Sequence, residues 1–305
     1  MERNVNSALL EETLALKKQK NALVLAHYYV PSETQAAADF VCDSFEMAKR
    51  AAQAEEELVV ICGVSFMGES AKILSPEKKV LLPEPAAGCP MAAMITPERV
   101  MAYRREHPEA AVVCYVNSSA AVKAVSDICC TSASAEKIVR SLPEKEIIFV
   151  PDCHLGSYIA QKCPDKTFYL HDGFCPRHHA VTEADVLYAK ALHPDCVFAA
   201  HPECREEVLK HADYIGSTSG IIRFAHETDA AGVIVGTENE ITEILRRELP
   251  DMEIWPVKPN FICTNMKKIT LEKLRDSLLY EQYEVTLTEE ELQGAKAALD
   301  RMVNV

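Results

Sequence analysis

The sequence predicts an α/β protein made of three homologous three-layer αβα sandwich domains, each with a small parallel sheet of about four strands. Three observations lead to this prediction. Short apolar runs alternate with helical patterns of about ten residues, a polar motif recurs at steps of 88 and 86 residues, and each copy leads to a cysteine. Strands alternating with helices indicate right-handed βαβ crossovers, which produce parallel sheets.

The repeat is clearest around three aspartates, each followed by a short apolar run and a hydroxyl residue. The aspartates are Asp39, Asp127 and Asp213. With the same offsets, a polar residue directly follows an apolar run, at His27, Tyr115 and His201. We expect these positions to be strand ends, and we expect the aspartates to satisfy nearby backbone groups at turns.

The other elements follow the same offsets. First strands are predicted at 23–26, 112–114 and 197–200, third strands at 58–62, 146–150 and 232–235, and last strands at 79–83, 167–170 and 253–257. Helical patterns cover 44–54, 134–142 and 238–249, and entry helices cover 6–20, 97–106 and 183–191. The predicted domains are 1–95, 96–181 and 182–269, arranged around a pseudo-threefold axis and followed by a helical tail at 270–305.

Composition and charge exclude several classes of protein. The chain has 305 residues, is 48% hydrophobic and contains 10 Gly, so it is neither disordered nor of low complexity. Its net charge of −14 disfavours nucleic acid as a partner. It shows no signal-like apolar stretch and no segment near the roughly 20 apolar residues of a membrane span. We therefore expect a cytosolic protein with no membrane partner.

The twelve cysteines contain no C-x-x-C pair, so any metal site must collect its ligands from distant segments. Most are expected to be inert buried thiols. Cys89, Cys175 and Cys263 differ from the rest, because steps of 86 and 88 residues place them at the same point of the repeat. Three sandwiches with their strand ends facing one axis would bring these thiols together.

In open α/β sheets, ligands bind outside the carboxyl ends of the strands. The polar residues predicted there are His27, Tyr29, Tyr115, Asn117, His201 and Glu203. Ser44, Ser132 and Thr218 are each expected to open a helix, where free N–H groups either are capped by the hydroxyl or bind an anion. Three such helix ends suit a substrate with several carboxylates or a phosphate.

Three convergent thiolates allow either zinc or a [4Fe–4S] cluster with one open iron. The cluster is favoured, because it spans several ångströms and so fits thiolates from three domains better than one small ion. An open iron is also a Lewis acid able to assist dehydration.

Several segments together resemble the quinolinate synthase family of bacterial de novo NAD synthesis. The segments are Ala26–Tyr29, Gly88–Ala92, Tyr115–Ser118, Cys130–Ala133, His201–Cys204, Gly216–Ser219 and Cys263–Lys267. The likeness covers nearly the whole chain. It implies an oxygen-sensitive [4Fe–4S] cluster and the condensation of iminoaspartate with dihydroxyacetone phosphate to quinolinate, phosphate and water. It also implies functional coupling to L-aspartate oxidase as the source of the imine.

The resemblance assigns roles residue by residue. Cys89, Cys175 and Cys263 would ligate the cluster. The substrate pocket would be lined by His27, Tyr29, Ser44, Tyr115, Asn117, Ser132, His178, His201 and Thr218. Glu203 is the candidate general base, and Tyr29 and the histidines at 27 and 201 are candidate proton carriers, with pKa values expected to move toward neutrality by burial. Val257 and Asn260 stand where some members carry a C-x-x-C-x-x-C run, so a disulfide there is not expected.

Two other functions fit the same pattern. A zinc hydrolase of this fold would be colourless and hold stoichiometric zinc. A non-enzymatic solute-binding or sensing protein would bind dicarboxylates at the helix ends without metal or turnover.

Overall fold

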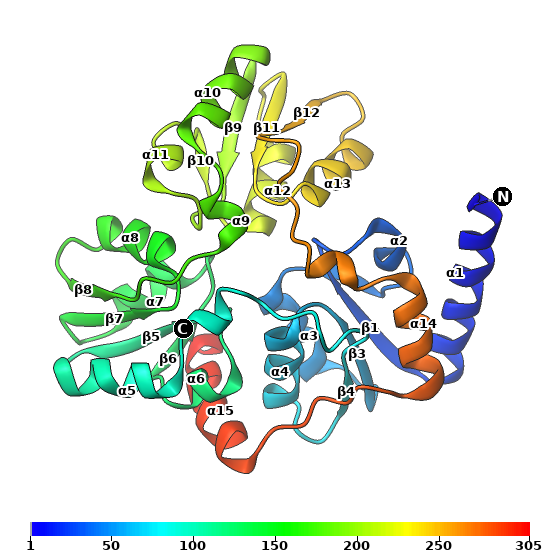
Figure 1. Cartoon of the computed structure of the whole chain (residues 1–305), viewed down its shortest axis with the longest axis horizontal. Helices are drawn as coiled ribbons and strands as arrows, with labels where there is room; N and C mark the ends of the chain where they lie inside the picture. The colour runs from blue at the N-terminus through cyan, green and yellow to red at the C-terminus, as the bar shows by residue number, and fades with distance from the viewer. Residues whose placement is uncertain (1) are drawn as a thin grey trace. The chain divides into compact units, whose positions relative to one another are not determined.

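A computed structural model describes residues 2–305, which contain three small parallel sheets of four strands each (Figure 1). The strand orders are β2-β1-β3-β4, β6-β5-β7-β8 and β10-β9-β11-β12, so the three sheets share one topology. In each, the first strand lies inside the sheet and the chain crosses over it to the third. This confirms the predicted fold class of three αβα sandwiches; their arrangement about an axis stays a prediction.

The first, third and last strands of each sheet match the predicted ranges to within two residues. The first sheet contains β1 (Ala22–His27), β2 (Phe40–Cys42), β3 (Leu58–Cys62) and β4 (Lys79–Leu81). The second contains β5 (Ala111–Tyr115), β6 (Ile128–Cys130), β7 (Glu146–Val150) and β8 (Thr167–Leu170). The third contains β9 (Cys196–Ala200), β10 (Tyr214–Ile215), β11 (Gly232–Gly236) and β12 (Glu253–Pro256).

Helices connect the strands. They are α1 (Glu2–Gln19), α2 (Ser32–Gln35), α3 (Ser44–Gln53), α4 (Ser65–Leu74), α5 (Pro97–Glu106), α6 (Ala120–Ala124), α7 (Ala135–Ser141), α8 (Cys153–Lys162), α9 (Pro176–His179), α10 (Glu183–Leu192), α11 (Glu206–Leu209), α12 (Thr218–Glu227), α13 (Glu240–Glu248), α14 (Leu271–Tyr280) and α15 (Glu289–Val303), with 3₁₀ turns η1 (Ala92–Met94) and η2 (Met266–Lys268). Among residues 2–305, no helix combines the length and the apolar composition that a bilayer crossing requires.

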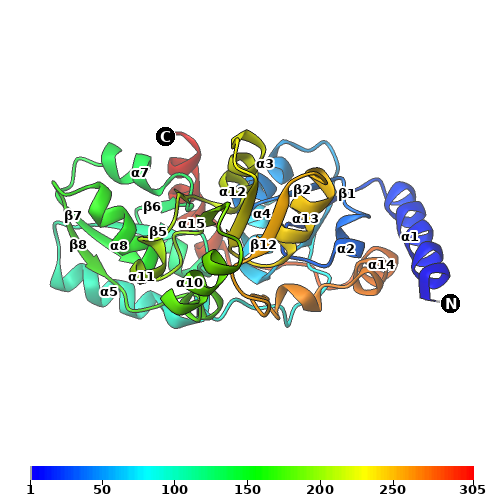
Figure 2. The ribbon, with the colours of Figure 1, turned by 90° about the horizontal axis from the view of Figure 1, so that it is seen from above.

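The central strands form the cores, because parallel strands covered by helices on both faces are apolar throughout. All six residues of β1 and all five residues of β3, β5 and β11 are buried. In the first sheet, α3 and α4 lie on one face and α1 and α14 on the other (Figure 1). Helix α14 lies beside α1 in both views (Figures 1 and 2).

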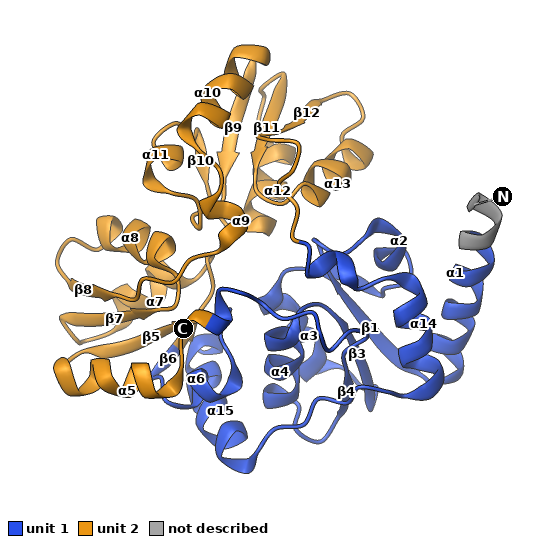
Figure 3. Ribbon diagram, viewed as in Figure 1, with its two compact units in different colours: residues 1–93, 116–128, 264–304 blue, residues 94–115, 129–263, 305 orange. Residues whose placement is uncertain are grey.

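The described chain divides into two compact units, each assembled from separated segments (Figure 3). Unit 1 comprises residues 1–93, 116–128 and 264–304, and it holds the first sheet with the C-terminal helices. Unit 2 comprises residues 94–115, 129–263 and 305, and it holds the third sheet and most of the second. The sequence-contiguous domain boundaries predicted above stay predictions.

The repeat predicted from the aspartates is visible in their hydrogen bonds. Asp39 accepts the backbone N–H of Val24 at 2.8 Å, and Asp213 accepts that of Phe198 at 2.7 Å. Each carboxylate thus ties the loop before a second strand to the middle of the first strand. The expectation that these aspartates satisfy backbone groups is confirmed at both positions.

The C-terminal tail is helical only in part. Between α14 and α15 the chain runs along the edge of the first sheet, where the N–H of Leu82 donates to Tyr283 and the N–H of Val285 donates to Val80. This segment covers the exposed edge of β4. Helix α15 then packs on α4 and α6, and Gly294 allows close contact, since a Cβ there would lie 2.8 Å from the carbonyl oxygen of Ala124.

Candidate active site

The three cysteines of the repeat follow equivalent backbone hydrogen bonds. In each sheet, the N–H at the start of the segment after the third strand donates to a carbonyl two residues before the cysteine. These bonds are Ser65 to Ala87 at 3.0 Å, Cys153 to Gly173 at 2.8 Å and Asn239 to Phe261 at 2.9 Å. The loops that carry Cys89, Cys175 and Cys263 are therefore anchored in the same way beside the carboxyl ends of their sheets.

Exposure also separates this trio from most other cysteines. Only Cys153 and the three repeat cysteines are partly exposed among the described residues, while the other eight are buried. Burial raises the pKa of Cys42 to about 12 and raises those of Cys62 and Cys204 further. Buried thiols of this kind are poor ligands, because the thiolate is the form that binds metal.

Two buried acids that the sequence analysis missed lie beside the cysteine loops of unit 2. Glu238 is 1% exposed, and its Oε1 accepts the backbone N–H of Cys263 at 3.2 Å. Asp152 is fully buried and caps α8 by accepting the N–H of Leu155 at 2.7 Å. Both lie two residues after a third strand and 86 residues apart, so the same repeat arithmetic could have identified them.

The histidines that end β1 and β9 make the same local contact. The backbone N–H of Tyr29 donates to Nδ1 of His27 at 3.2 Å, and that of Glu203 donates to Nδ1 of His201 at 3.2 Å. A neutral imidazole that accepts at Nδ1 carries its proton on Nε2. In unit 2, Nε2 of His201 lies 3.2 Å from the hydroxyl of Ser132, so this proton points at a site residue.

His27 and Tyr29 also contact each other in unit 1. Their ring centroids lie 4.6 Å apart in an edge-on arrangement. Lys267 donates to the carbonyl oxygen of Tyr29 at 2.8 Å and so holds the loop that carries both rings. Lys267 belongs to the Cys263–Lys267 segment on which the resemblance partly depends, and the structure gives it a positioning contact.

Glu203 is the centre of the polar cluster in unit 2. Its Oε1 accepts the phenol O–H of Tyr115 at 2.8 Å, and its Oε2 lies 2.9 Å from Nδ1 of His178. Both side chains of the Glu203 and His178 pair are 5% exposed. Two carboxylate oxygens with two separate partners hold this group in one orientation.

The pKa of Glu203 is lowered, although a buried catalytic carboxyl is expected to have its pKa raised toward neutrality. Burial alone raises it, but the nearby imidazoles of His178 and His201, together with hydrogen bonds from His178 and Tyr115, lower the pKa of this carboxyl to about 2. Asp152 differs, because burial and then the charge of Glu203 raise its pKa well above the usual range. The pKa values of these two neighbouring buried carboxyls are thus moved in opposite directions, a division typical of acid–base sites.

His178 joins this cluster to Cys175. Its Nδ1 lies 3.3 Å from Sγ of Cys175, and its Nε2 lies 3.0 Å from the hydroxyl of Thr237 at the end of β11. The ring also packs 5.0 Å from that of His201 and edge-on against Phe261. The structure therefore brings six predicted site residues into one cluster, namely Tyr115, Ser132, Cys175, His178, His201 and Glu203.

Two of the three predicted helix starts are confirmed. Ser44 and Thr218 are the first residues of α3 and α12, but the caps are the residues before them, Asp43 and Ser217, whose side chains accept N–H groups. The prediction for Ser132 is wrong, since α7 begins at Ala135. A turn in which the hydroxyls of Thr131 and Ser134 bond each other's N–H groups intervenes.

For the remaining predicted residues, the structure gives a position within their own unit. Asn117 is half-buried two residues after β5. It belongs to unit 1 together with His27, Tyr29, Ser44 and Cys89, while the other predicted site residues belong to unit 2.

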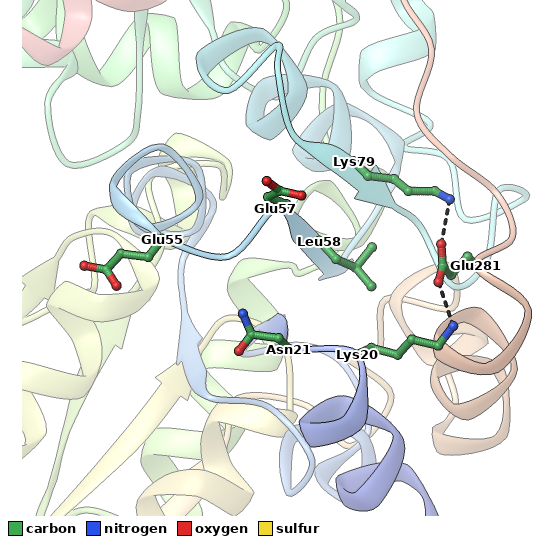
Figure 4. A pocket seen from close by; sticks show the side chains of 7 residues that line it. All are labelled: Lys20, Asn21, Glu55, Glu57, Leu58, Lys79 and Glu281. Atoms are coloured by element: carbon green, nitrogen blue, oxygen red, sulfur yellow. Dashed lines mark hydrogen bonds and ion pairs between the residues drawn. The ribbon is translucent and has the colours of Figure 1, made fainter.

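An open pocket of about 460 Å³ in unit 1 lies at the opposite edge of the first sheet, where β1, β3 and β4 begin (Figure 4). Glu281 lies between Lys20 and Lys79 there, at 2.6 and 2.8 Å (Figure 4). These ion pairs attach the C-terminal segment to the sheet, so we assign the pocket a structural role.

Comparison with known proteins finds relatives that match nearly the whole chain. The family model described as "Quinolinate synthetase A protein" matches residues 11–304. A "Quinolinate synthase" from Caldicellulosiruptor saccharolyticus is 49% identical over 290 residues, which are 95% of this chain and 96% of that protein. "Quinolinate synthase 2" from Methanosarcina acetivorans is 49% identical over 297 residues, 97% of this chain and 96% of that protein. A "Quinolinate synthase" from Clostridium perfringens is 48% identical over 280 residues, 92% and 93% of the two chains. The chain therefore belongs to the quinolinate synthetase A family of enzymes.

Proposed function

We propose that this enzyme condenses iminoaspartate with dihydroxyacetone phosphate to quinolinate, releasing phosphate and water in NAD biosynthesis, and that it holds a [4Fe–4S] cluster on Cys89, Cys175 and Cys263. The observation that carries the proposal is the repetition of one anchored, partly exposed cysteine in each of three equivalent loops. Membership of the quinolinate synthetase A family supports quinolinate as the product.

The residues fit such a cluster. Iron–sulfur clusters are held by thiolates, and these three cysteines are partly exposed. A buried carboxylate orients the N–H of Cys263, which is a common way to support a metal ligand. When bound, the cluster would supply an open iron as a Lewis acid for dehydration.

The chain's own groups supply the proton transfers. Glu203 is ionised and fixes the Tyr115 hydroxyl and the His178 ring, so its first role is to orient two proton carriers. His201 directs its Nε2 proton toward Ser132 and can protonate a leaving hydroxyl or a carbonyl oxygen. His27 and Tyr29 form the matching pair in unit 1. A low pKa makes the lone Glu203 carboxylate a weak base, so we assign base function to the Glu203–His178 pair.

The anionic groups of the substrates have matching partners. Helices α3 and α12 are ten residues long and begin with Ser44 and Thr218, so each presents a hydroxyl and first-turn N–H groups at its positive end, beside the capping side chains of Asp43 and Ser217. A phosphate or carboxylate bound there would be positioned without a basic side chain. Asn117 would add a neutral hydrogen-bonding group.

The imine substrate is unstable in water, so a dehydrogenating enzyme such as L-aspartate oxidase would have to supply it. Direct transfer predicts that adding this oxidase in increasing ratio raises the quinolinate yield even when total imine production is held constant. If only the total imine supply matters, the two enzymes do not need to be coupled.

The decisive test is the set of single variants Cys89→Ser, Cys175→Ser and Cys263→Ser, purified without oxygen. We expect each to lose the visible absorbance of the cluster and bound iron, together with quinolinate formation from iminoaspartate generated in situ. Cys153→Ser is the matched control, because Cys153 is partly exposed as well but lies outside the repeat position. It should retain iron.

Retention of a full cluster in any of the three variants would contradict the proposed ligand set. Colourless wild-type protein with stoichiometric zinc would instead support the zinc hydrolase, and dicarboxylate binding without turnover would support a solute-binding protein.

A further inference from the structure

We propose that Cys175, His178 and Glu203 form a site for one divalent transition-metal ion, zinc by its chemistry, when the three-cysteine centre is empty. In the proposed function, His178 and Glu203 are not metal ligands. The zinc site depends on contacts within unit 2 alone. Only the competition between zinc and the cluster for Cys175 rests on the proposed function.

The ligand atoms are already close together. Sγ of Cys175, Nδ1 of His178 and a carboxylate oxygen of Glu203 all lie within 4.8 Å of one another. Zinc bonds of about 2.0–2.3 Å place tetrahedral ligands about 3.4 Å apart. The 3.3 Å between Sγ and Nδ1 meets this value, and the 2.9 Å between Nδ1 and Oε2 must open by about half an ångström.

The surrounding contacts orient each ligand atom. The Thr237 hydroxyl engages Nε2 of His178 at 3.0 Å, which leaves Nδ1 facing the thiol and the carboxylate. The Tyr115 hydroxyl engages Oε1 of Glu203, which leaves Oε2 facing the same point. Outer contacts of this kind are regular features of zinc sites, because they fix the imidazole tautomer and the carboxylate rotamer.

The local charge favours a cation. Glu203 and Asp152 are two carboxyl groups at 4% and 0% exposure, and they interact electrostatically. Oδ2 of Asp152 has no hydrogen-bond partner among the described residues, an uncommon state for a buried oxygen. A divalent ion bound by Oε2 of Glu203 would offset the negative charge of this buried carboxylate.

The donor set selects the metal. One thiolate, one imidazole and one carboxylate match the mixed sulfur, nitrogen and oxygen ligands that zinc accepts, with a water as the fourth ligand. Binding replaces the thiol proton of Cys175 by the metal, so one proton is released for each ion bound at this ligand. The partial exposure of Cys175 provides access from solvent.

The test uses the full-length, cluster-free protein with Co²⁺ as a spectroscopic probe and Zn²⁺ as competitor, in reductant and without oxygen. We expect one Co²⁺ per chain with a sulfur-to-cobalt charge-transfer band and tetrahedral d–d bands, displaced by one Zn²⁺. Cys175→Ser should abolish the charge-transfer band. His178→Asn and Glu203→Gln should each weaken binding at least tenfold.

Three controls separate this site from the cysteine trio. Cys89→Ser and Cys263→Ser should keep wild-type cobalt spectra and affinity, although both are expected to lose the cluster. His179→Asn should also bind normally, because His179 is adjacent in sequence but pairs with His154 instead. Thr237→Val removes only the outer hydrogen bond and should weaken binding by about 10- to 100-fold without removing a ligand.

Unchanged affinity in both His178→Asn and Glu203→Gln would overturn the proposal. So would loss of the charge-transfer band in Cys89→Ser or Cys263→Ser, because the ion would then be held by the trio. Folding of each variant is checked by its thermal melt. The failure of the cluster proposal has a different signature, namely iron retained in Cys89→Ser, and it leaves the cobalt result unaffected.

Discussion

The phenol hydroxyl of Tyr115 donates a hydrogen bond of 2.8 Å to Oε1 of Glu203. Tyr115 ends β5 of the second sheet and Glu203 follows β9 of the third, so one buried bond joins the strand ends of two sheets within unit 2. The two residues occupy equivalent regions of the repeat, 88 positions apart. Their contact shows that the carboxyl ends of these two sheets share one polar cluster.

Tyr115→Phe should shift the acid limb of the pH profile of kcat toward higher pH. The hydrogen bond from Tyr115 helps to lower the pKa of Glu203 to about 2, so its loss makes the carboxylate easier to protonate. Activity that needs the ionised form, which is present above this pKa, is then lost earlier as the pH falls. Tyr188→Phe on exposed α10 is the control, and identical acid limbs in both variants would refute the role of Tyr115.

Substitutions of His201 should distinguish the roles of its two ring nitrogens. Asparagine can replace Nδ1 as acceptor for the Glu203 N–H, but it cannot reach Ser132, so His201→Asn should keep the wild-type Tm and lose about 10²- to 10⁴-fold in kcat. His201→Leu removes both contacts and should also lower the Tm. Measuring kcat and Tm for both variants tests this, and a fully active asparagine variant would exclude proton transfer at Nε2.

Removing an aspartate of the repeat should destabilise its own sheet. Asp213→Ala leaves the N–H of Phe198 in the third sheet without its carboxylate, and Asp39→Ala does the same to Val24 in the first. Each should lower the free energy of unfolding by about 1–3 kcal/mol. Urea denaturation measures this against Asp251→Ala on an exposed turn, which should be neutral. Equal stability of all three variants would mean that water replaces the lost bond.

Glu281→Gln should lower the free energy of unfolding by an amount that depends on pH. Lys20 and Lys79 lower the pKa of Glu281 to about 2, so the ion pairs stabilise the folded state above the unfolded pKa of the carboxyl, 4.5, and this stabilisation is lost as pH falls toward 2. Because the groups are partly exposed and screened, we expect a loss of only about 0.5–1 kcal/mol near neutrality. Denaturation at several pH values and at about 1 M salt should show the difference vanish at low pH and shrink in salt. A constant difference would contradict an electrostatic origin.

Gly294→Ala should destabilise the protein although alanine favours helices. A Cβ at this position would lie 2.8 Å from both Cβ and the carbonyl oxygen of Ala124, so α15 would have to move away from α6. Overpacking of this kind costs about 1–3 kcal/mol, which exceeds the gain of about 1 kcal/mol from helix propensity. Thermal unfolding measures the balance, with Gln293→Ala on the exposed face as control. A stabilised alanine variant would mean that the two helices can separate freely.

Most of the fold could be predicted from the chain, because the apolar period and the 86- and 88-residue steps are local patterns. The ranges of β3, β7 and β8 and the starts of α3 and α12 coincide with the predicted ones. Ser132 was misplaced, because a hydroxyl turn and the start of a helix have the same residue preferences. The segment along β4 was predicted as helix, since a bridge to a distant edge strand leaves no mark in local sequence.

The sequence by itself determined which residues recur at each strand end, including the cysteine trio, because repeat spacing is a property of the chain alone. Only the tertiary structure decided what those residues do to one another. It paired Glu203 with His178 and Tyr115 and so lowered a pKa that burial alone would have raised. It also placed Asp152 beside Glu203 and His178 beside Cys175. Charge and hydrogen bonding act over a few ångströms, and the distances between side chains are set by packing between sheets.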